Sequence, residues 1–168
     1  MSDENVNGEA LTLAEVQELA RELLENCDIG DIRPVEISAE LVASIPRKYT
    51  NIGLETTSQY AVAEGVFRNR FGFKFTLTDD EDEPVAALSF TLIVEWAVEE
   101  SYTPRQEAAE YVATTTGFFA AYPYARELAQ STASRLGLDP VLLGILNRNE
   151  IRPRAIGSAI RTPAEEEE

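Results

Sequence analysis

The residue types that most often carry out enzyme chemistry are nearly absent from this chain. Its 168 residues include no histidine and one cysteine, Cys27. Histidine is the commonest general base in enzymes. Its absence also excludes the Ser-His-Asp arrangement and most transition-metal sites. No lysine or arginine lies beside Cys27 in the sequence to stabilise a thiolate, so we interpret it as a small buried side chain on a helix. The sequence therefore predicts a protein that is not an enzyme and that uses no cofactor or metal.

The densest group of carboxylates, Asp79-Asp80-Glu81-Asp82-Glu83, has residue types that could bind calcium. It lacks the glycine and the spaced final glutamate of an EF-hand loop. We interpret it as a solvated turn between two strands.

The overall charge and the terminal sequence restrict the partners and the location. A net charge of −16 at pH 7 repels phosphate, which argues against nucleic acid and anionic membrane surfaces as partners. Mimicry of DNA by an acidic protein stays open as an alternative. Residues 1–8 lack the features of a secretory signal, and no apolar run approaches the roughly 18 residues of a membrane span. Together with the lone cysteine, these features predict a cytoplasmic protein.

The hydrophobic periodicity predicts a helix followed by four antiparallel strands. An amphipathic helix is expected over residues 12–28, with a capping box formed by Thr12 and Glu15 and a stop near Gly30. A first strand with one buried face follows over 32–43, and a crossover at 44–50 leads to a second strand near 52–56. The third strand, 67–77, has one aromatic face and one cationic face, and a turn at 79–84 leads to the fourth, 85–98.

Two helices are expected after the strands. Thr103-Pro104-Arg105-Gln106 resembles a second capping box with proline at the first helical position. This helix is expected to break at Pro123, because proline lacks an N–H and clashes with the preceding turn. A second helix would then run to Gly137. The predicted class is α+β: a four-stranded antiparallel sheet covered on one face by a long helix and a second helix, with an extra N-terminal amphipathic helix.

The run Tyr122-Pro123-Tyr124-Ala125-Arg126-Glu127, in this order of elements, resembles the SecB family of export chaperones. Residues 111–117 look closer to SecB-like chaperones that accompany toxin–antitoxin pairs, or to solitary relatives, than to the general export protein. The N-terminal helix exceeds the short acidic tail typical of that family. The expected organisation is a disordered acidic tail over 1–11, the N-terminal amphipathic helix over 12–28, a SecB-like chaperone domain over 32–146 and a flexible tail over 147–168.

The resemblance implies an ATP-independent holdase that keeps unfolded or nascent polypeptides soluble, its clients being secretory precursors or an antitoxin. It implies a homotetramer, a dimer of dimers. Its client groove would lie between the crossover and the second helix, with Ile45, Tyr49, Ile52, Leu128, Leu136, Leu138, Leu142 and Leu143. The oligomer interface would include Tyr111, Thr115, Phe118, Phe119 and Tyr122, and the structural motif would consist of Pro123, Tyr124, Arg126 and Glu127.

Three alternatives remain open at this point. The apolar residues named above can instead be ordinary core residues. The aromatic sheet face can form the pocket of a carrier for a small apolar ligand or lipid. The acidic turn at 79–83 can dock a basic partner, such as the SecA translocation motor, which would make the protein an adaptor. Delay of protein aggregation without ATP distinguishes the holdase from the carrier and the adaptor.

Overall fold

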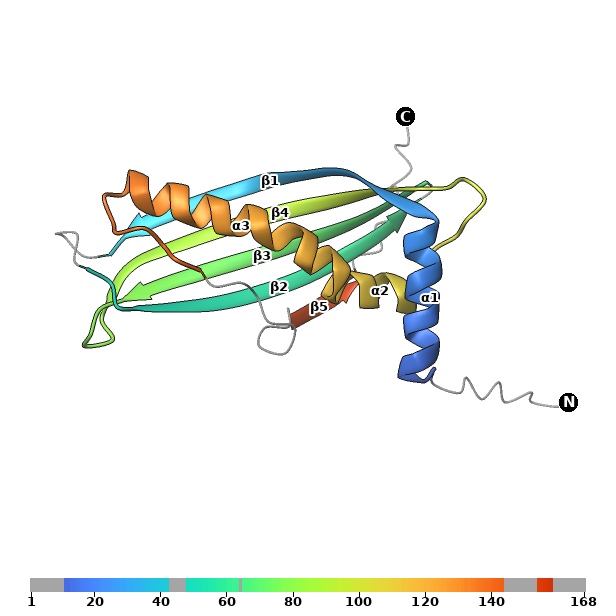
Figure 1. Ribbon diagram of the computed structural model, residues 1–168, viewed down its shortest axis with the longest axis horizontal. Helices are drawn as coiled ribbons and strands as arrows, with labels where there is room; N and C mark the ends of the chain where they lie inside the picture. The colour runs from blue at the N-terminus through green and yellow to red at the C-terminus, as the bar shows by residue number, and fades with distance from the viewer. Residues whose placement is uncertain (1–10, 43–47, 64, 144–153, 159–168) are drawn as a thin grey trace, which may run out of the picture.

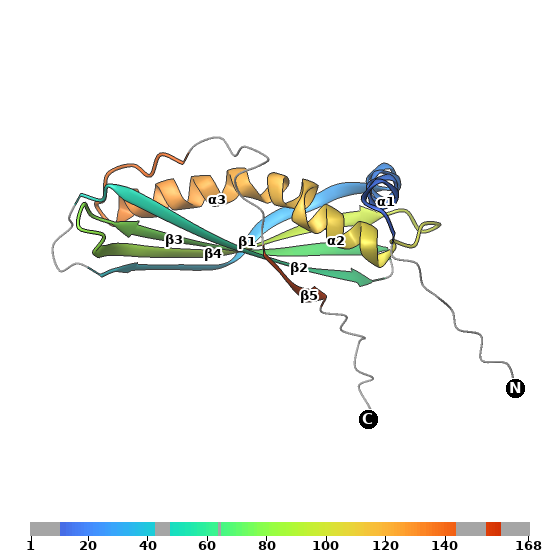
Figure 2. The same cartoon turned by 90° about the horizontal axis from the view of Figure 1, so that it is seen from below.

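The computed structural model describes residues 11–42, 48–63 and 65–143 and the backbone of 154–158 (Figure 1). One sheet carries the strands in the order β1-β4-β3-β2-β5, and the pairs among β1 to β4 are antiparallel, which confirms the predicted α+β class. α2 and α3 cover one face of this sheet, and α1 stands at one end of it (Figure 2). The elements are α1 (Leu13–Glu25), β1 (Cys27–Leu41), β2 (Asn51–Ala63), β3 (Val66–Thr78), β4 (Pro84–Val98), α2 (Gln106–Thr114), α3 (Thr116–Arg135) and β5 (Arg154–Ser158).

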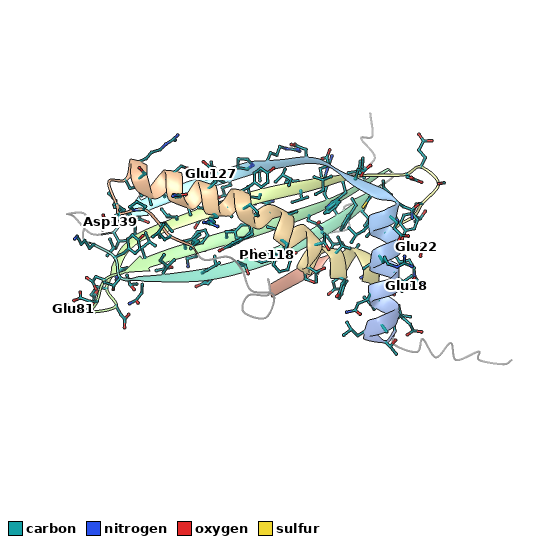
Figure 3. The ribbon with its side chains drawn as sticks, in the orientation of Figure 1. Glu18, Glu22, Glu81, Phe118, Glu127 and Asp139 are labelled. Carbon is teal, nitrogen blue, oxygen red and sulfur yellow. The ribbon has the colours of Figure 1, made fainter. Side chains whose placement is uncertain are left out.

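The core forms between α3 and the centre of the sheet, where β3 and β4 alternate in phase. Phe73 of β3 lies opposite Phe90 of β4, and both are buried. Phe118 of α3 stacks on Phe73 with ring centroids 5.7 Å apart and lies between the helix and the sheet (Figure 3). The predicted apolar face of β3 is confirmed. Its buried members are Phe67, Phe71, Phe73, Phe75 and Leu77.

β1 lies at an edge of the sheet and pairs with β4, which confirms the predicted crossover. The prediction that its apolar face is buried is wrong, because Val35 and Leu41 are exposed and Ile37 is 54% exposed. The physical reason is that α3 packs mainly against β4 and β3 and makes little contact with the edge strand. Alternating apolar residues fit a pleated surface whether or not a second layer covers it.

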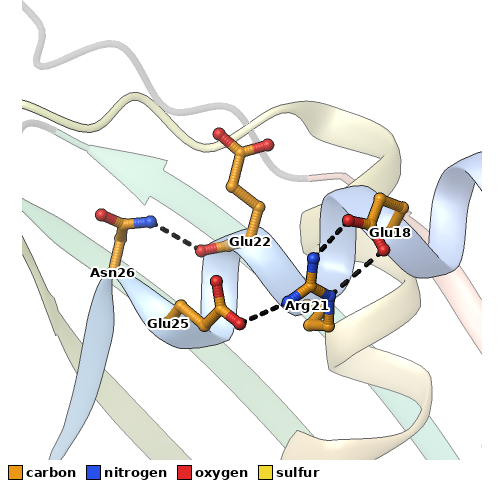
Figure 4. A network of polar contacts seen from close by, with 5 residues as sticks. All are labelled: Glu18, Arg21, Glu22, Glu25 and Asn26. Atoms are coloured by element: carbon orange, nitrogen blue, oxygen red, sulfur yellow. Dashed lines mark hydrogen bonds and ion pairs between the residues drawn. The ribbon is translucent and has the colours of Figure 1, made fainter.

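α1 begins as predicted and ends earlier than predicted. The capping box is formed, since the Oγ1 of Thr12 accepts from the N–H of Glu15 and the Glu15 carboxylate accepts from the N–H of Thr12. The helix ends at Asn26, whose side-chain amide donates to the carbonyl oxygen of Glu22 at 2.8 Å (Figure 4). Gly30 instead lies at an irregularity in the β1–β4 ladder.

The break between the two later helices lies at Thr115, so the predicted hinge at Pro123 is wrong. Thr115 leaves the helical conformation with φ −123° and ψ −94°, and α3 continues through Pro123 to Arg135. Pro123 is exposed, whereas Tyr122 and Ala125 beside it are buried. Packing of this inner face against the sheet maintains the helix at the cost of the one backbone hydrogen bond that proline cannot make.

Gly117 explains why the chain bends at Thr115. A Cβ at position 117 would lie 2.6 Å from the Oδ1 of Asn69 and 3.2 Å from the Cζ of Phe71. The backbone therefore approaches β3 at a distance that only glycine permits. The sequence carried this signal in Thr114-Thr115-Thr116-Gly117, where β-branched residues and glycine weaken a helix.

We expect the substitution Gly117→Ala to lower the free energy of unfolding by about 1–3 kcal/mol, the usual cost of overpacking a core. Asn69 cannot easily yield, because its Oδ1 accepts from the Nε1 of Trp96 at 2.8 Å. Gly53→Ala is the matched control, since its added Cβ would lie 3.7 Å from the nearest atom. Denaturant-induced unfolding measures both variants, and equal stability would show that the close approach can relax.

The remaining boundaries differ from prediction at one helix start and at the C-terminus. α2 begins at Gln106 after an extended Arg105 whose side chain makes no cap, so the second capping box is wrong. Gly137 follows α3 with a φ of 73°, as predicted. Arg154–Ser158, within the expected flexible tail, forms β5 beside β2, and this strand was not predicted.

Candidate functional site

The segment that follows α3 packs back along the start of β2. The O–H of Tyr49 donates to the carbonyl oxygen of Pro140 at 2.6 Å. Leu138 and Val141 are buried, whereas Leu142 beside them is 79% exposed. The core therefore anchors this segment on both sides of Asp139 and Pro140, while Leu142 is presented to solvent.

The predicted client-binding residues fall into three groups. Tyr49, Ile52, Leu128, Leu136 and Leu143 are partly buried against the core, and Leu138 is a core residue. Leu142 alone among those described is strongly exposed. Ile45 lies outside the described residues. Most of these side chains therefore contribute to the packing of the core, as the alternative interpretation predicts.

A second group of exposed apolar residues was missed by the sequence analysis, and we call it the β1 strip: Ile37, Leu41 and Val42. Ile37 lies opposite Phe90 across the β1–β4 ladder, and Phe90 points to the helix-covered side. Directly opposite residues share a face, so Ile37 points to that side too. The signal was present in the sequence as alternation, but alternation does not reveal whether a helix covers the strand.

α3 carries an exposed aromatic residue, Tyr124. It is 47% exposed, and it lies four residues before Leu128 on the same side of the helix. Tyr122, two residues earlier, packs toward Phe73 of β3 with ring centroids 6.4 Å apart. Because residues two apart on a helix point in nearly opposite directions about its axis, Tyr124 points away from the sheet and into solvent.

Two curated proteins are similar to this chain in sequence. No family model matches the chain. The SecB-like chaperone Rv1957 of Mycobacterium tuberculosis strain H37Rv and the SecB-like chaperone MT2006 of strain CDC 1551 are each 34% identical over 90 residues. The matched region is 52% of this chain and 48% of theirs, so the chain spans about half the length of the curated relatives it matches.

A solved structure covers more of the chain than these sequence matches do. It is that of Mycobacterium tuberculosis Rv1957 in complex with a ChAD peptide from the Rv1956 HigA1 antitoxin, and it superposes with a TM-score of 0.71 at 26% identity. The superposition covers 79% of this chain and 99% of that one. The fold is that of a SecB-like chaperone. The resemblance inferred from Tyr122–Glu127 is thereby confirmed.

Within the SecB-like fold, the run Tyr122–Glu127 lies in the middle of α3. Its buried members, Tyr122 and Ala125, pack toward the sheet, while Pro123, Tyr124, Arg126 and Glu127 are exposed. Burial raises the pKa of Tyr122, and the nearby Arg126 guanidinium opposes that shift. A structural role for the run stays a prediction, but its expected position at a helix start is wrong.

The residues predicted for an oligomer interface differ in their exposure to solvent. Phe118 is 1% exposed and contacts the rings of Phe71, Phe73, Phe119 and Tyr122, so it belongs to the core of a single chain. Tyr122 is buried as well. An interface role stays a prediction for the half-buried members Tyr111, Thr115 and Phe119.

The opposite face of the SecB-like sheet is charged, and its cations have acidic neighbours. The Nε of Arg68 donates to the Glu95 carboxylate at 2.7 Å, and Arg33 lies 3.7 Å from the same group. Lys74 lies 3.9 Å from Glu55. Acidic neighbours thus largely neutralise the positive charge of the predicted cationic face. The exposed apolar residues Ile37, Tyr124 and Leu142 do not lie on this face.

The side chains that could be reactive or bind metal have structural roles in this fold. Cys27 is half-buried at the start of β1, so its expected place as a buried residue on a helix is wrong. Burial, with a smaller contribution from Asp28, raises the pKa of its thiol to about 11, so the thiol keeps its proton at neutral pH. The carboxylate of Asp79 accepts from the N–H groups of Glu81 and Glu83, both at 3.0 Å, which orders the acidic turn. Among the described residues no cluster of three or more metal-ligating side chains occurs, and no helix is long and apolar enough to cross a membrane.

The aromatic face required by the carrier alternative is filled by the protein itself. Phe71, Phe73 and Phe75 are buried, and Phe118 of α3 packs on the first two of these rings. A small apolar ligand would have to displace α3 to reach this face. The exposed apolar residues outside the core are therefore the better candidates for binding.

We expect Tyr49→Phe to release the segment that presents Leu142. The phenylalanine keeps the ring but loses the hydrogen bond to Pro140, whose net value is about 0.5–1.5 kcal/mol. Burial and the nearby Asp139 raise the pKa of Tyr49, so the hydroxyl remains a donor at neutral pH. Hydrogen exchange measures the result: the amides of residues 138, 139 and 141–143 should exchange faster in the variant. Unchanged exchange would show that Leu138 and Val141 alone hold the segment.

Proposed function

We propose that this protein is a chaperone that holds unfolded polypeptides without ATP. The observation that carries this proposal is the exposure of Leu142 and Tyr124 on a chain with a packed core. Large apolar side chains that remain exposed outside a packed core are candidates for contact with other proteins. The antitoxin peptide in the Rv1957 complex supports the same reading for a protein of the same fold.

The proposed mechanism is binding alone, with no covalent step. An extended client buries its apolar side chains against Leu142 and Tyr124, and each large side chain removed from water contributes about 1.5–3 kcal/mol. Contacts of this kind do not select one sequence. The net charge of −16 keeps the complex soluble, because complexes of like charge repel one another.

Among client classes, we propose an antitoxin, or another protein with an aggregation-prone segment. Support comes from the antitoxin peptide seated on Rv1957. Secretory precursors offer the same chemistry, namely extended apolar segments. Peptide arrays made from both classes distinguish them by which segments bind.

Aggregation assays test the proposed function. In the absence of ATP, a stoichiometric amount of the protein should delay light scattering by several unrelated unfolding proteins. An equally acidic globular protein at the same concentration controls for charge. If scattering by all substrates is unchanged, the holdase proposal is wrong.

We further propose that the chain forms a homotetramer, a dimer of dimers, in which the open edge of β1 pairs with a second copy. Support comes from the apolar β1 strip on an edge strand of 15 residues, since unpaired edges with apolar side chains favour strand pairing. Ile37→Lys should shift the native mass toward the monomer. Ser38→Lys is the matched control, because Ser38 lies opposite Ser89 on the other face of the sheet. Light scattering after size-exclusion chromatography measures both, and a monomeric parent protein would contradict the proposal.

A further inference from the structure

We propose that β5 occupies a strand-docking edge on β2, and that an extended client segment binds there by displacing it. The identity of the displacing partner rests on the proposed chaperone function. The occupancy of the edge by this chain's own segment does not, since it follows from the pairing of β5 with β2.

β5 covers only part of the edge that it occupies. It pairs in parallel with β2 at Thr57, Ser58 and Tyr60, and the register is irregular between the last two. β2 contains 13 residues and β5 contains 5. Along residues 51–56 of β2, no described segment pairs with the outer edge.

The pairing has the features of a replaceable one. Parallel ladders are slightly less stable per residue than antiparallel ladders, and this ladder is short and irregular. An extended client can pair along more of β2 and so form more backbone hydrogen bonds than β5 forms. The exchange therefore replaces a short ladder by a longer one of the same chemistry.

The surroundings of β5 favour recognition of a main chain over recognition of particular side chains. The helix-covered face of β2 is closed at this point, because Ser58 is buried and its hydroxyl donates to the carbonyl oxygen of Ala113 in α2 at 3.3 Å. The edge offers backbone N–H and C=O groups, which any extended polypeptide can pair with. Such a site suits a partner of variable sequence.

The edge also leads to the apolar surface already described. β2 starts at Asn51, immediately after the segment that carries Tyr49, and Tyr49 bonds the loop that presents Leu142. A client strand that extends from the β5 position along β2 thus approaches Tyr49 and the segment to which Tyr49 bonds, which carries Leu142. Backbone pairing and apolar contact would act on the same client.

A full-length variant with Ala155→Pro and Ile156→Pro opens the edge. Adjacent residues of a strand direct their N–H groups to opposite sides, so this pair removes a donor that faces β2 in either register. The matched control carries Ala159→Pro and Ile160→Pro, the same residue types just beyond β5. Circular dichroism and the unfolding midpoint verify that both variants fold.

The first probe is a labelled synthetic peptide with the sequence of residues 152–160. It should bind the edge-opened variant, and binding to the parent chain and to the control should be at least tenfold weaker, because a site that is open a tenth of the time binds tenfold more weakly. Equal binding to all three proteins, or no binding to the edge-opened variant, overturns the proposal. This result does not depend on any client.

The second probe is reduced and alkylated lactalbumin, a permanently unfolded protein, added in saturating amounts to the unaltered chain. Amide hydrogen exchange of residues 155–158 should accelerate, since the client takes the place of β5. If lactalbumin binds and these amides keep their protection, the displacement proposal fails and the chaperone proposal stands. If lactalbumin does not bind at any concentration, the chaperone proposal fails, and the peptide probe still decides whether the edge accepts an extended segment.

Discussion

Replacing Leu142 with aspartate should weaken the binding of an unfolded polypeptide by about 10- to 100-fold while the fold stays intact. Burying a leucine is worth about 1.5–3 kcal/mol, and each 1.4 kcal/mol corresponds to a factor of ten in affinity. Leu142 is 79% exposed, so the free protein loses little packing when it is replaced. Fluorescence anisotropy with labelled, reduced and alkylated lactalbumin measures the affinity, and thermal unfolding measures the fold.

Leu13→Asp is the matched control for that experiment. Leu13 is 66% exposed and lies at the start of α1. α1 stands at one end of the sheet, and α3 ends toward the other (Figure 1). Both variants add one negative charge to a chain that already carries −16. Equal weakening by the two variants would attribute the effect to charge and would contradict a client surface at Leu142.

Phe118→Ala should lower the free energy of unfolding by about 3–5 kcal/mol, which is a large part of the 5–15 kcal/mol typical of a domain. The cavity would open beneath α3, where Phe118 contacts Phe71, Phe73 and Tyr122. Tyr124→Ala removes an aromatic ring from the exposed side of the same helix and should cost less than about 1 kcal/mol.

Denaturant unfolding of both aromatic variants at two protein concentrations distinguishes a core role of Phe118 from an interface role. Substitution of a core residue lowers the free energy of unfolding equally at both protein concentrations. Substitution of an interface residue lowers it by an amount that depends on protein concentration. If Phe118→Ala and Tyr124→Ala cost the same, the intramolecular packing described for Phe118 would be wrong.

The antiparallel strands and the core could be predicted because β3 alternates between buried and outward positions along its whole length, and β4 does so from Ala86 onward. The alternation from Phe67 to Leu77 specifies a face, and the turn at Asp79–Glu83 joins two such strands. The crossover also followed from the sequence, since the stretch after β1 has no hairpin signal. These features depend on local patterns that a sequence displays directly.

The errors arose where tertiary packing decides between local options. Pro123 weakens a helix locally, yet contacts of its neighbours with the sheet maintain α3, while Gly117 permits the close approach that bends the chain instead. The exposure of Ile37 depends on how closely α3 packs over the edge strand, and the sequence of β1 does not indicate this. β5 is five residues long and exists as a strand through its partner β2.

The pairing of β1 with β4 has a consequence for the order in which the molecule is built. Ile37 pairs with Phe90, so a ribosome must add more than fifty residues after β1 before its partner strand exists. β2 and β3, joined by a short turn, can assemble during that interval because their contacts are close in sequence. β1 is therefore made early but joins late, and its apolar side chains are in contact with water throughout synthesis of the strands it will border. A protein proposed to shelter unfolded chains presents the same hazard in its own nascent state.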